Sequence, residues 1–183
     1  MQNPIPAAFF AALAIALIVW KLRQRRLTSR TNAQTAAEDC ARYSHLTQQM
    51  LSGLAEEELM RAVICNLQSK MAPDRSDAFA VVSKLSLERQ AVYLIYAVTR
   101  AVNYSGFSAL KKSGGEELLP LCASALHTLG LQNAADLMLQ AASAPQPDRL
   151  RAAYLRAFNR QGGPAKMAAY IRQHAAAFCD APA

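Results

Sequence analysis

The residue types that bind metals or act as nucleophiles are present but widely spaced. The cysteines and histidines are Cys40, Cys65, Cys122, Cys179, His45, His127 and His174. A tetrahedral zinc site needs close Cys or His pairs, and no C-x-x-C pair occurs. Cys122 and His127 are five positions apart, so they do not share a helix face. The sequence therefore predicts no metal or cofactor and favours free thiols, which suit a reducing cytoplasm.

Two glycine-containing turns and a few acidic residues are the remaining candidates for chemistry. Ser113-Gly114-Gly115 and residues 162–166 resemble phosphate loops superficially, but neither matches G-x-x-x-x-G-K-[ST] or follows a strand. The run Glu56-Glu57-Glu58 is typical of an acidic first turn that compensates a helix dipole. No carboxylates have catalytic spacing, so we expect that the protein is not an enzyme. A pocket converging on His127 or Glu116-Glu117 would favour the alternative, an enzyme whose site is assembled only in the fold.

The elements that must position these residues are helices. Apolar residues recur every three to four positions, the period of an α-helix. The central predicted helix begins after Ser86, which is a suitable N-cap, and has Glu88 in its first turn. A second helix ends before Gly130, which can take positive φ, and a third follows. Further helices are predicted at about 36–54, 56–71, 76–85, 149–160, with Asp148 as cap, and 164–178. No strand pattern appears, so the predicted fold is all-α.

A sharp corner interrupts the central helical stretch at Tyr104-Ser105-Gly106-Phe107. Gly106 permits the positive φ at which a helix can stop and turn back. Phe107 can fill the gap between two helices, and the Asn103 amide can bond exposed carbonyls. We interpret this corner as structural, with contact to a partner as the alternative.

The corner carries a family resemblance together with two later motifs, residues 113–117 and 125–130. This combination resembles the C-terminal domain of the DNA-mimic protein family over about residues 85–142, and possible extension to 178 rests on Tyr170-Ile171. The family pattern is an Asn-Gly-Gly-Phe corner, a short helix, a Ser-Gly turn and an Ala-Leu-x-x-x-Gly helix end. Here Tyr104-Ser105 replaces the Asn-Gly pair and Leu110-Lys111 replaces an aromatic pair. The resemblance implies a small helical domain and no assigned activity. Its structural residues are Asn103, Gly106, Phe107 and Gly130.

The N-terminus predicts a single membrane-spanning helix. Residues 4–20 carry no charge, a length near the lower limit for crossing the hydrocarbon of a lipid bilayer. The interfacial Trp20 precedes a basic cluster of Lys21, Arg23, Arg25, Arg26 and Arg30. We predict a transmembrane anchor at 1–22, a basic juxtamembrane linker at 23–35 and a compact multi-helix globular domain at 36–183. The positive-inside rule places that domain in the cytoplasm, below the inner membrane. A cleaved signal peptide is the alternative, but it would need a basic leading region.

Charge narrows the class of partner. The net charge is +7, but beyond residue 30 the chain has 15 Lys or Arg against 13 Asp or Glu. A nearly neutral body is weak evidence for nucleic-acid binding, and mimicry of DNA needs an acidic face that this chain lacks. We therefore predict a membrane-anchored, cytoplasmic helical protein-interaction module that binds no nucleic acid. Its protein partner is unidentified, and a homo-oligomer is compatible with the sequence. A toxin-immunity-type binding protein is a further alternative.

Overall fold

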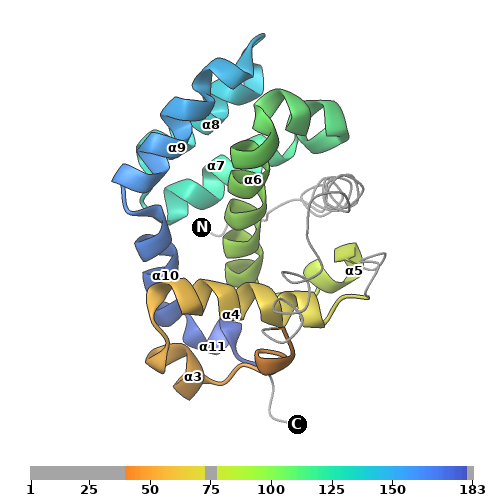
Figure 1. Cartoon of the computed structure of the whole chain (residues 1–183), viewed down its shortest axis with the longest axis vertical. Helices are drawn as coiled ribbons and strands as arrows, with labels where there is room; N and C mark the ends of the chain where they lie inside the picture. The colour runs from red at the N-terminus through yellow and green to blue at the C-terminus, as the bar shows by residue number, and fades with distance from the viewer. Residues whose placement is uncertain (1–39, 73–77, 181–183) are drawn as a thin grey trace, which may run out of the picture.

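The computed structural model describes residues 40–72 and 78–180. These residues are helical and contain no strand, which confirms the all-α prediction for this part of the chain (Figure 1). The α-helices are α3 (Gln48–Gly53), α4 (Glu56–Ser69), α5 (Ala78–Val82), α6 (Leu87–Leu110), α7 (Leu118–Thr128), α8 (Gln132–Ser143), α9 (Arg151–Arg160), α10 (Gly163–Gln173) and α11 (Ala175–Phe178). A π-helical turn, η1 (Lys111–Gly115), and a 3-10 turn, η2 (Pro147–Leu150), connect them.

The long helix α6 organises the domain. Ser86 caps it, because the Ser86 hydroxyl accepts the Arg89 N–H at 3.3 Å, and Glu88 lies in the first turn as predicted. The C-terminal half of α6 packs against α7 and α9, and its N-terminal part contacts α11. α4 crosses the N-terminal end of α6 and contacts α10 (Figure 1). α10 also contacts α6 and α9, so it connects the end of the molecule that contains α4 to the end that contains α9.

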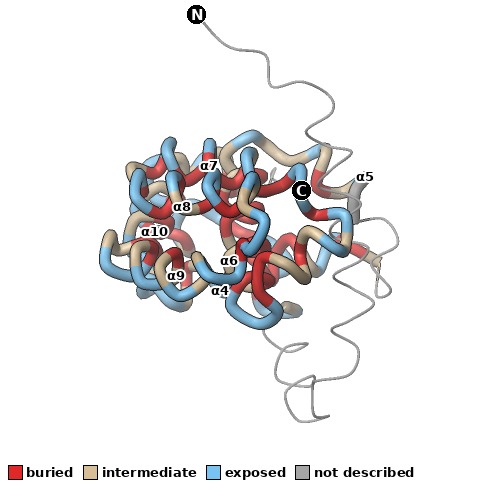
Figure 2. Tube along the Cα trace, turned by 90° about the horizontal axis from the view of Figure 1, so that it is seen from above, coloured by how far each residue is buried: buried red, intermediate tan, exposed pale blue. Residues whose placement is uncertain are grey.

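A single apolar core runs through both ends. Its residues line the inner sides of the helices, while the outer sides are exposed (Figure 2). The largest fully buried side chains are Tyr43, Leu46, Leu51, Leu59, Leu94, Ile95, Phe107, Leu119, Leu126, Tyr154 and Phe178. Burial of each such side chain contributes on the order of 1.5–3 kcal/mol. The apolar residues of α6, α7 and α8, whose periodicity predicted these helices, lie in this core, and α7 packs against both α6 and α8.

Two predicted helix boundaries are wrong. The helix expected over 36–54 is interrupted after Arg42, and α3 begins anew behind Thr47, whose hydroxyl accepts the Met50 N–H at 3.3 Å. The Asn66 side chain explains the break, because it donates to the Tyr43 carbonyl at 3.1 Å and to that of Ser44 at 3.0 Å. These two hydrogen bonds hold Tyr43 and Ser44 in the turn that separates the helical residues. The last predicted helix, 164–178, divides into α10 and α11 at His174.

The predicted anchor lies outside the described residues. This applies to segments 1–22 and 23–35 and to the flanking residues Trp20, Lys21, Arg23, Arg25 and Arg26. Among the helices of residues 40–72 and 78–180, none has the length and apolarity needed to cross a membrane. The membrane-spanning helix therefore stays a prediction.

Candidate interaction surface at the α6 corner

The corner predicted in α6 is a kink at Gly106. Its backbone has φ +81° and ψ 170°, a region that is essentially restricted to glycine, so the predicted positive φ is present. A Cβ at this position would lie 2.4 Å from Oδ1 of Asp148. The backbone angles therefore demand glycine here, and any larger residue would also displace the Asp148 carboxylate.

Asp148 stabilises the turn that follows the kink. Its Oδ1 accepts the Ser108 N–H at 3.1 Å, as an N-cap would, although the two residues lie 40 positions apart. A hydrogen bond from the Ser108 side chain, together with the backbone N–H groups of Ser108 and Phe107, lowers the pKa of Asp148. The prediction that Asp148 caps the helix near residue 149 is thus wrong. The carboxylate turns instead to the broken end of α6, where unsatisfied N–H groups favour an anion.

A residue of α9 holds the part of α6 that precedes the kink. The Arg151 guanidinium donates to the Asn103 carbonyl. The Asn103 side chain is exposed, so this residue contributes through its backbone and not through the amide bonds that the sequence predicted. Asp148 and Arg151 therefore clamp the kink from both sides.

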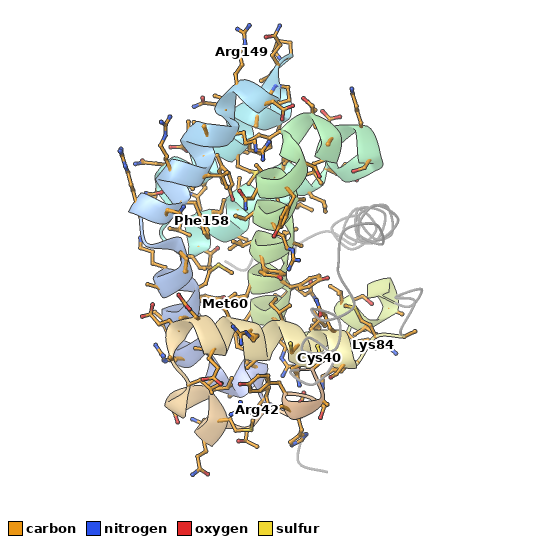
Figure 3. All side chains as sticks on the ribbon, in the orientation of Figure 1. Cys40, Arg42, Met60, Lys84, Arg149 and Phe158 are labelled. Carbon is orange, nitrogen blue, oxygen red and sulfur yellow. The ribbon has the colours of Figure 1, made fainter. Side chains whose placement is uncertain are left out.

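An aromatic cluster fills the space behind the kink. Phe107 is fully buried, and its ring centroid is 5.6 Å from that of Tyr154, in an edge-to-face arrangement. The ring centroids of Tyr154 and Phe158 are 6.3 Å apart, and Phe158 lies on the side of α9 that faces α6 (Figure 3). The Tyr154 hydroxyl is 2.6 Å from that of Thr99, so the one polar group in this cluster is satisfied. Phe107 has the gap-filling role expected from the sequence.

Gly130 makes the corresponding turn between α7 and α8. Its φ is +70°, as predicted, and the following Leu131 N–H returns to the Leu126 carbonyl at 2.9 Å. This is the hydrogen bond of a Schellman helix end. The Lys166 ammonium donates to the Gly130 carbonyl and thereby links this turn to α10.

The exposed side of α6 beside the corner carries a ladder of three side chains, Tyr96, Arg100 and Tyr104. The Arg100 guanidinium carbon lies 5.8 Å from the centre of the Tyr96 ring and 5.5 Å from that of Tyr104. Arg100 also donates to the Tyr96 hydroxyl at 2.5 Å. Tyr104 is 66% exposed, the highest value for any large hydrophobic side chain in the described residues. Sequence reasoning did not single out Tyr96 or Arg100, although their spacing of four indicates one helix face.

The residues proposed for chemistry do not converge. His127 is exposed, with Nε2 3.8 Å from Asp136, whereas Glu116 pairs with Lys111 at 3.1 Å. Burial raises the pKa of the Cys122 thiol far above its usual value, which leaves it unreactive. Within the described residues, no three His, Cys, Asp or Glu side chains are grouped to hold a metal. A cavity of about 10 Å³ between α4 and α6 has room for about one water molecule.

A second polar cluster fastens the C-terminal end to the domain. Asp180 accepts hydrogen bonds from Lys70 at 2.6 Å, the Asn66 amide at 2.8 Å and the Leu46 N–H at 3.0 Å. Arg89 adds a contact at 3.3 Å. Burial alone would raise the pKa of Asp180, but these hydrogen bonds outweigh it and hold the pKa well below the usual value. This cluster joins α4, α6 and the residues after α11.

Comparison with known families places the corner and its supports in one unit. Residues 83–174 match a family model described as DMP19-like protein. The match confirms the DNA-mimic resemblance predicted from the motifs, and it reaches residue 174, within the possible extension to 178. It therefore includes η2 and α9, which supply the clamp residues Asp148 and Arg151 and the aromatic residues Tyr154 and Phe158. No curated protein and no solved structure matches the chain.

Proposed function

Because the chain belongs to the DMP19-like protein family, we propose that it is a helical protein-interaction module that binds its partner through the Tyr96–Arg100–Tyr104 ladder. The observation that carries this proposal is the exposed ring of Tyr104, held against Arg100 at a kink that is clamped on both sides. A side chain that is ordered before binding loses little conformational entropy when a partner docks.

The chemistry of the ladder suits a protein partner. Tyrosine and arginine are the residue types over-represented among side chains that dominate binding energy in protein interfaces. Arg100 lies against two tyrosine rings, so its cation is attracted to both aromatic faces and its side chain is held in place. Tyr104 is also a position at which the chain departs from the family corner pattern. We therefore assign Tyr104 to partner choice and Gly106 to the scaffold.

The charge of the family segment argues against DNA mimicry. Residues 83–174 contain 11 Lys or Arg and 5 Asp or Glu. A DNA mimic presents carboxylates where DNA presents phosphates, so it must repel other acidic surfaces and attract basic ones. A segment with an excess of cations attracts acidic surfaces and repels basic ones. The proposed module therefore uses the family scaffold without a DNA-like face.

The test is site-specific crosslinking in cells. A photo-crosslinking amino acid at Tyr104 of the full-length protein should give one predominant protein adduct, identified by mass spectrometry. The matched control carries the same amino acid at Ser124, which is exposed on α7. Adducts of equal yield at both positions, or none at Tyr104, would contradict the proposal.

The membrane tether is the second part of the proposal. Its support is the uncharged segment 4–20 followed by five basic residues from Lys21 to Arg30. This pattern favours an N-terminal anchor with residues 31–183 in the cytoplasm, and such a tether would confine the ladder to partners at or near the bilayer. A C-terminal reporter that is active only outside the cytoplasm should be silent. Strong reporter activity, or full extraction of the protein by alkaline carbonate, would refute the proposed tether.

A further inference from the structure

A second surface lies on the opposite side of α9 from its buried aromatic residues. Arg156 and Arg160 are four positions apart and share one face of α9, and Arg149 lies in η2, seven positions before Arg156. Arg156 and Arg160 are one turn apart, about 6 Å along the axis. Figure 3 shows Arg149 projecting from the end of the molecule, away from the core. We call these three residues the α9 arginine face.

The three arginine side chains are exposed, and their guanidinium groups have no partner among the described residues. None of them forms an ion pair or hydrogen bond within the part of the chain that the structure describes. This distinguishes them from Arg151, which clamps the corner, and from Arg172, which donates to the Leu54 carbonyl at 2.9 Å. No acidic residue occurs from 149 to 179. Asp148 in η2 is occupied as the cap of the α6 kink, so α9 itself offers these cations no acidic side chain.

The core holds this face rigidly. Tyr154 and Phe158 anchor the inner side of α9, with exposed fractions of 0% and 7%. The backbone that carries the arginines is thus fixed before any ligand arrives. Guanidinium groups bind planar oxyanions in a bidentate manner, and three of them on one rigid face define a site for several carboxylates.

We infer that the α9 arginine face is a docking site for an acidic protein segment, separate from the ladder on α6. Charge complementarity supports this occupant over two other polyanions. A membrane surface would gain from an apolar side chain that enters the bilayer, but the exposed residue beside Arg156 is the small Ala152. Nucleic-acid binding draws on many phosphate contacts, whereas this face offers three cations and the same molecule exposes Glu56 and Glu57.

The experiment measures binding of a fluorescein-labelled oligoglutamate peptide to the full-length protein in uncharged detergent micelles. The test variant is Arg156→Glu/Arg160→Glu. Its matched control is Lys84→Glu/Lys112→Glu, which changes the net charge equally at two exposed positions outside α9. We expect the test variant to bind about tenfold more weakly, since each exposed ion pair contributes modestly and reversal adds repulsion. The control should retain most of the affinity, and Arg156→Lys/Arg160→Lys should retain more than the Glu variant.

Three outcomes would overturn the inference. The first is an equal loss in the test and control variants, which would mean that net charge alone governs binding. The second is the absence of measurable binding by the wild-type protein at low ionic strength. The third is a larger fall in the binding of phosphatidylglycerol vesicles or duplex DNA than in the binding of oligoglutamate when Arg156→Glu/Arg160→Glu replaces the wild-type protein. Melting temperatures of all variants serve as the folding check, because every substituted residue is exposed.

Discussion

Replacement of Gly106 by alanine is the sharpest perturbation of the scaffold, because it adds one methyl group at the kink of α6. That methyl group would lie 2.4 Å from Oδ1 of Asp148. The backbone would also have to keep φ +81° and ψ 170° with a Cβ present. Gly106→Ala therefore introduces two separate costs, one in the backbone and one against the capping carboxylate.

The magnitude follows from these two costs. A residue held in this glycine-only region costs about 1–3 kcal/mol. Displacement of the carboxylate weakens its hydrogen bond to the Ser108 N–H, and we assign about 0.5–1 kcal/mol to this loss because Asp148 is exposed and screened by solvent. The total is about 1.5–4 kcal/mol. For a domain of this size that lowers the melting temperature by about 5–12 °C.

The assay is thermal and urea-induced unfolding of the full-length protein, followed by circular dichroism. Asp148→Ala and the double variant complete a double-mutant cycle. In the Asp148→Ala background the methyl group no longer meets a carboxylate, so Gly106→Ala should cost at least about 0.5 kcal/mol less. Gly53→Ala is the matched control, because a Cβ there meets nothing within 4 Å. It should leave stability unchanged or raise it by up to about 1 kcal/mol.

Two results would refute the reasoning about the corner. If the Gly106→Ala and Gly53→Ala variants had the same melting temperature, the positive φ at Gly106 would carry no energetic cost. If the cycle were additive, Asp148 would not restrict the space beside Gly106.

The remaining predictions concern the core, the C-terminal cluster and the ladder. Phe107→Ala should destabilise the domain by about 3–5 kcal/mol in urea unfolding, because it leaves a cavity against Tyr154; a loss below about 1 kcal/mol would count against a structural role. Asp180→Asn should cost about 1–3 kcal/mol at neutral pH. Because the folded pKa of Asp180 lies below the unfolded value near 3.9, its stabilisation is full above that pH and is lost as the pH falls further. Wild type and variant should therefore converge in acid, and a constant difference down to low pH would exclude this linkage. Tyr104→Ala should change stability by less than about 0.5 kcal/mol, as expected for an exposed side chain.

Local features of the fold could be predicted from the sequence. The periodic stripes identified α6, α7 and α8, Ser86 marked the start of α6, and Gly106 and Gly130 marked positions of positive φ. Each of these signals acts within a few residues of its own position. Hydrophobic spacing and glycine therefore carry most of the information about these elements.

Contacts between distant segments could not be predicted in this way. Asp148 looked like a cap for the helix that follows it, and only the folded chain brings its carboxylate to Ser108. The break before Thr47 depends on Asn66, which reaches back from α4. The ladder is different, because its spacing of four was visible in the sequence. Its exposure, however, depends on which side of α6 the other helices cover.

The most direct test of the central claim is the affinity of the partner captured at Tyr104 for the wild-type protein and for Tyr104→Ala. Truncation of a hot-spot side chain costs about 2 kcal/mol or more, so we expect the dissociation constant to rise about 30-fold or more while the melting temperature stays the same. Duplex DNA added to the wild-type complex should not displace the partner. An unchanged dissociation constant for Tyr104→Ala would contradict binding through the ladder, and displacement by DNA would show that the protein occupies a DNA-binding surface after all.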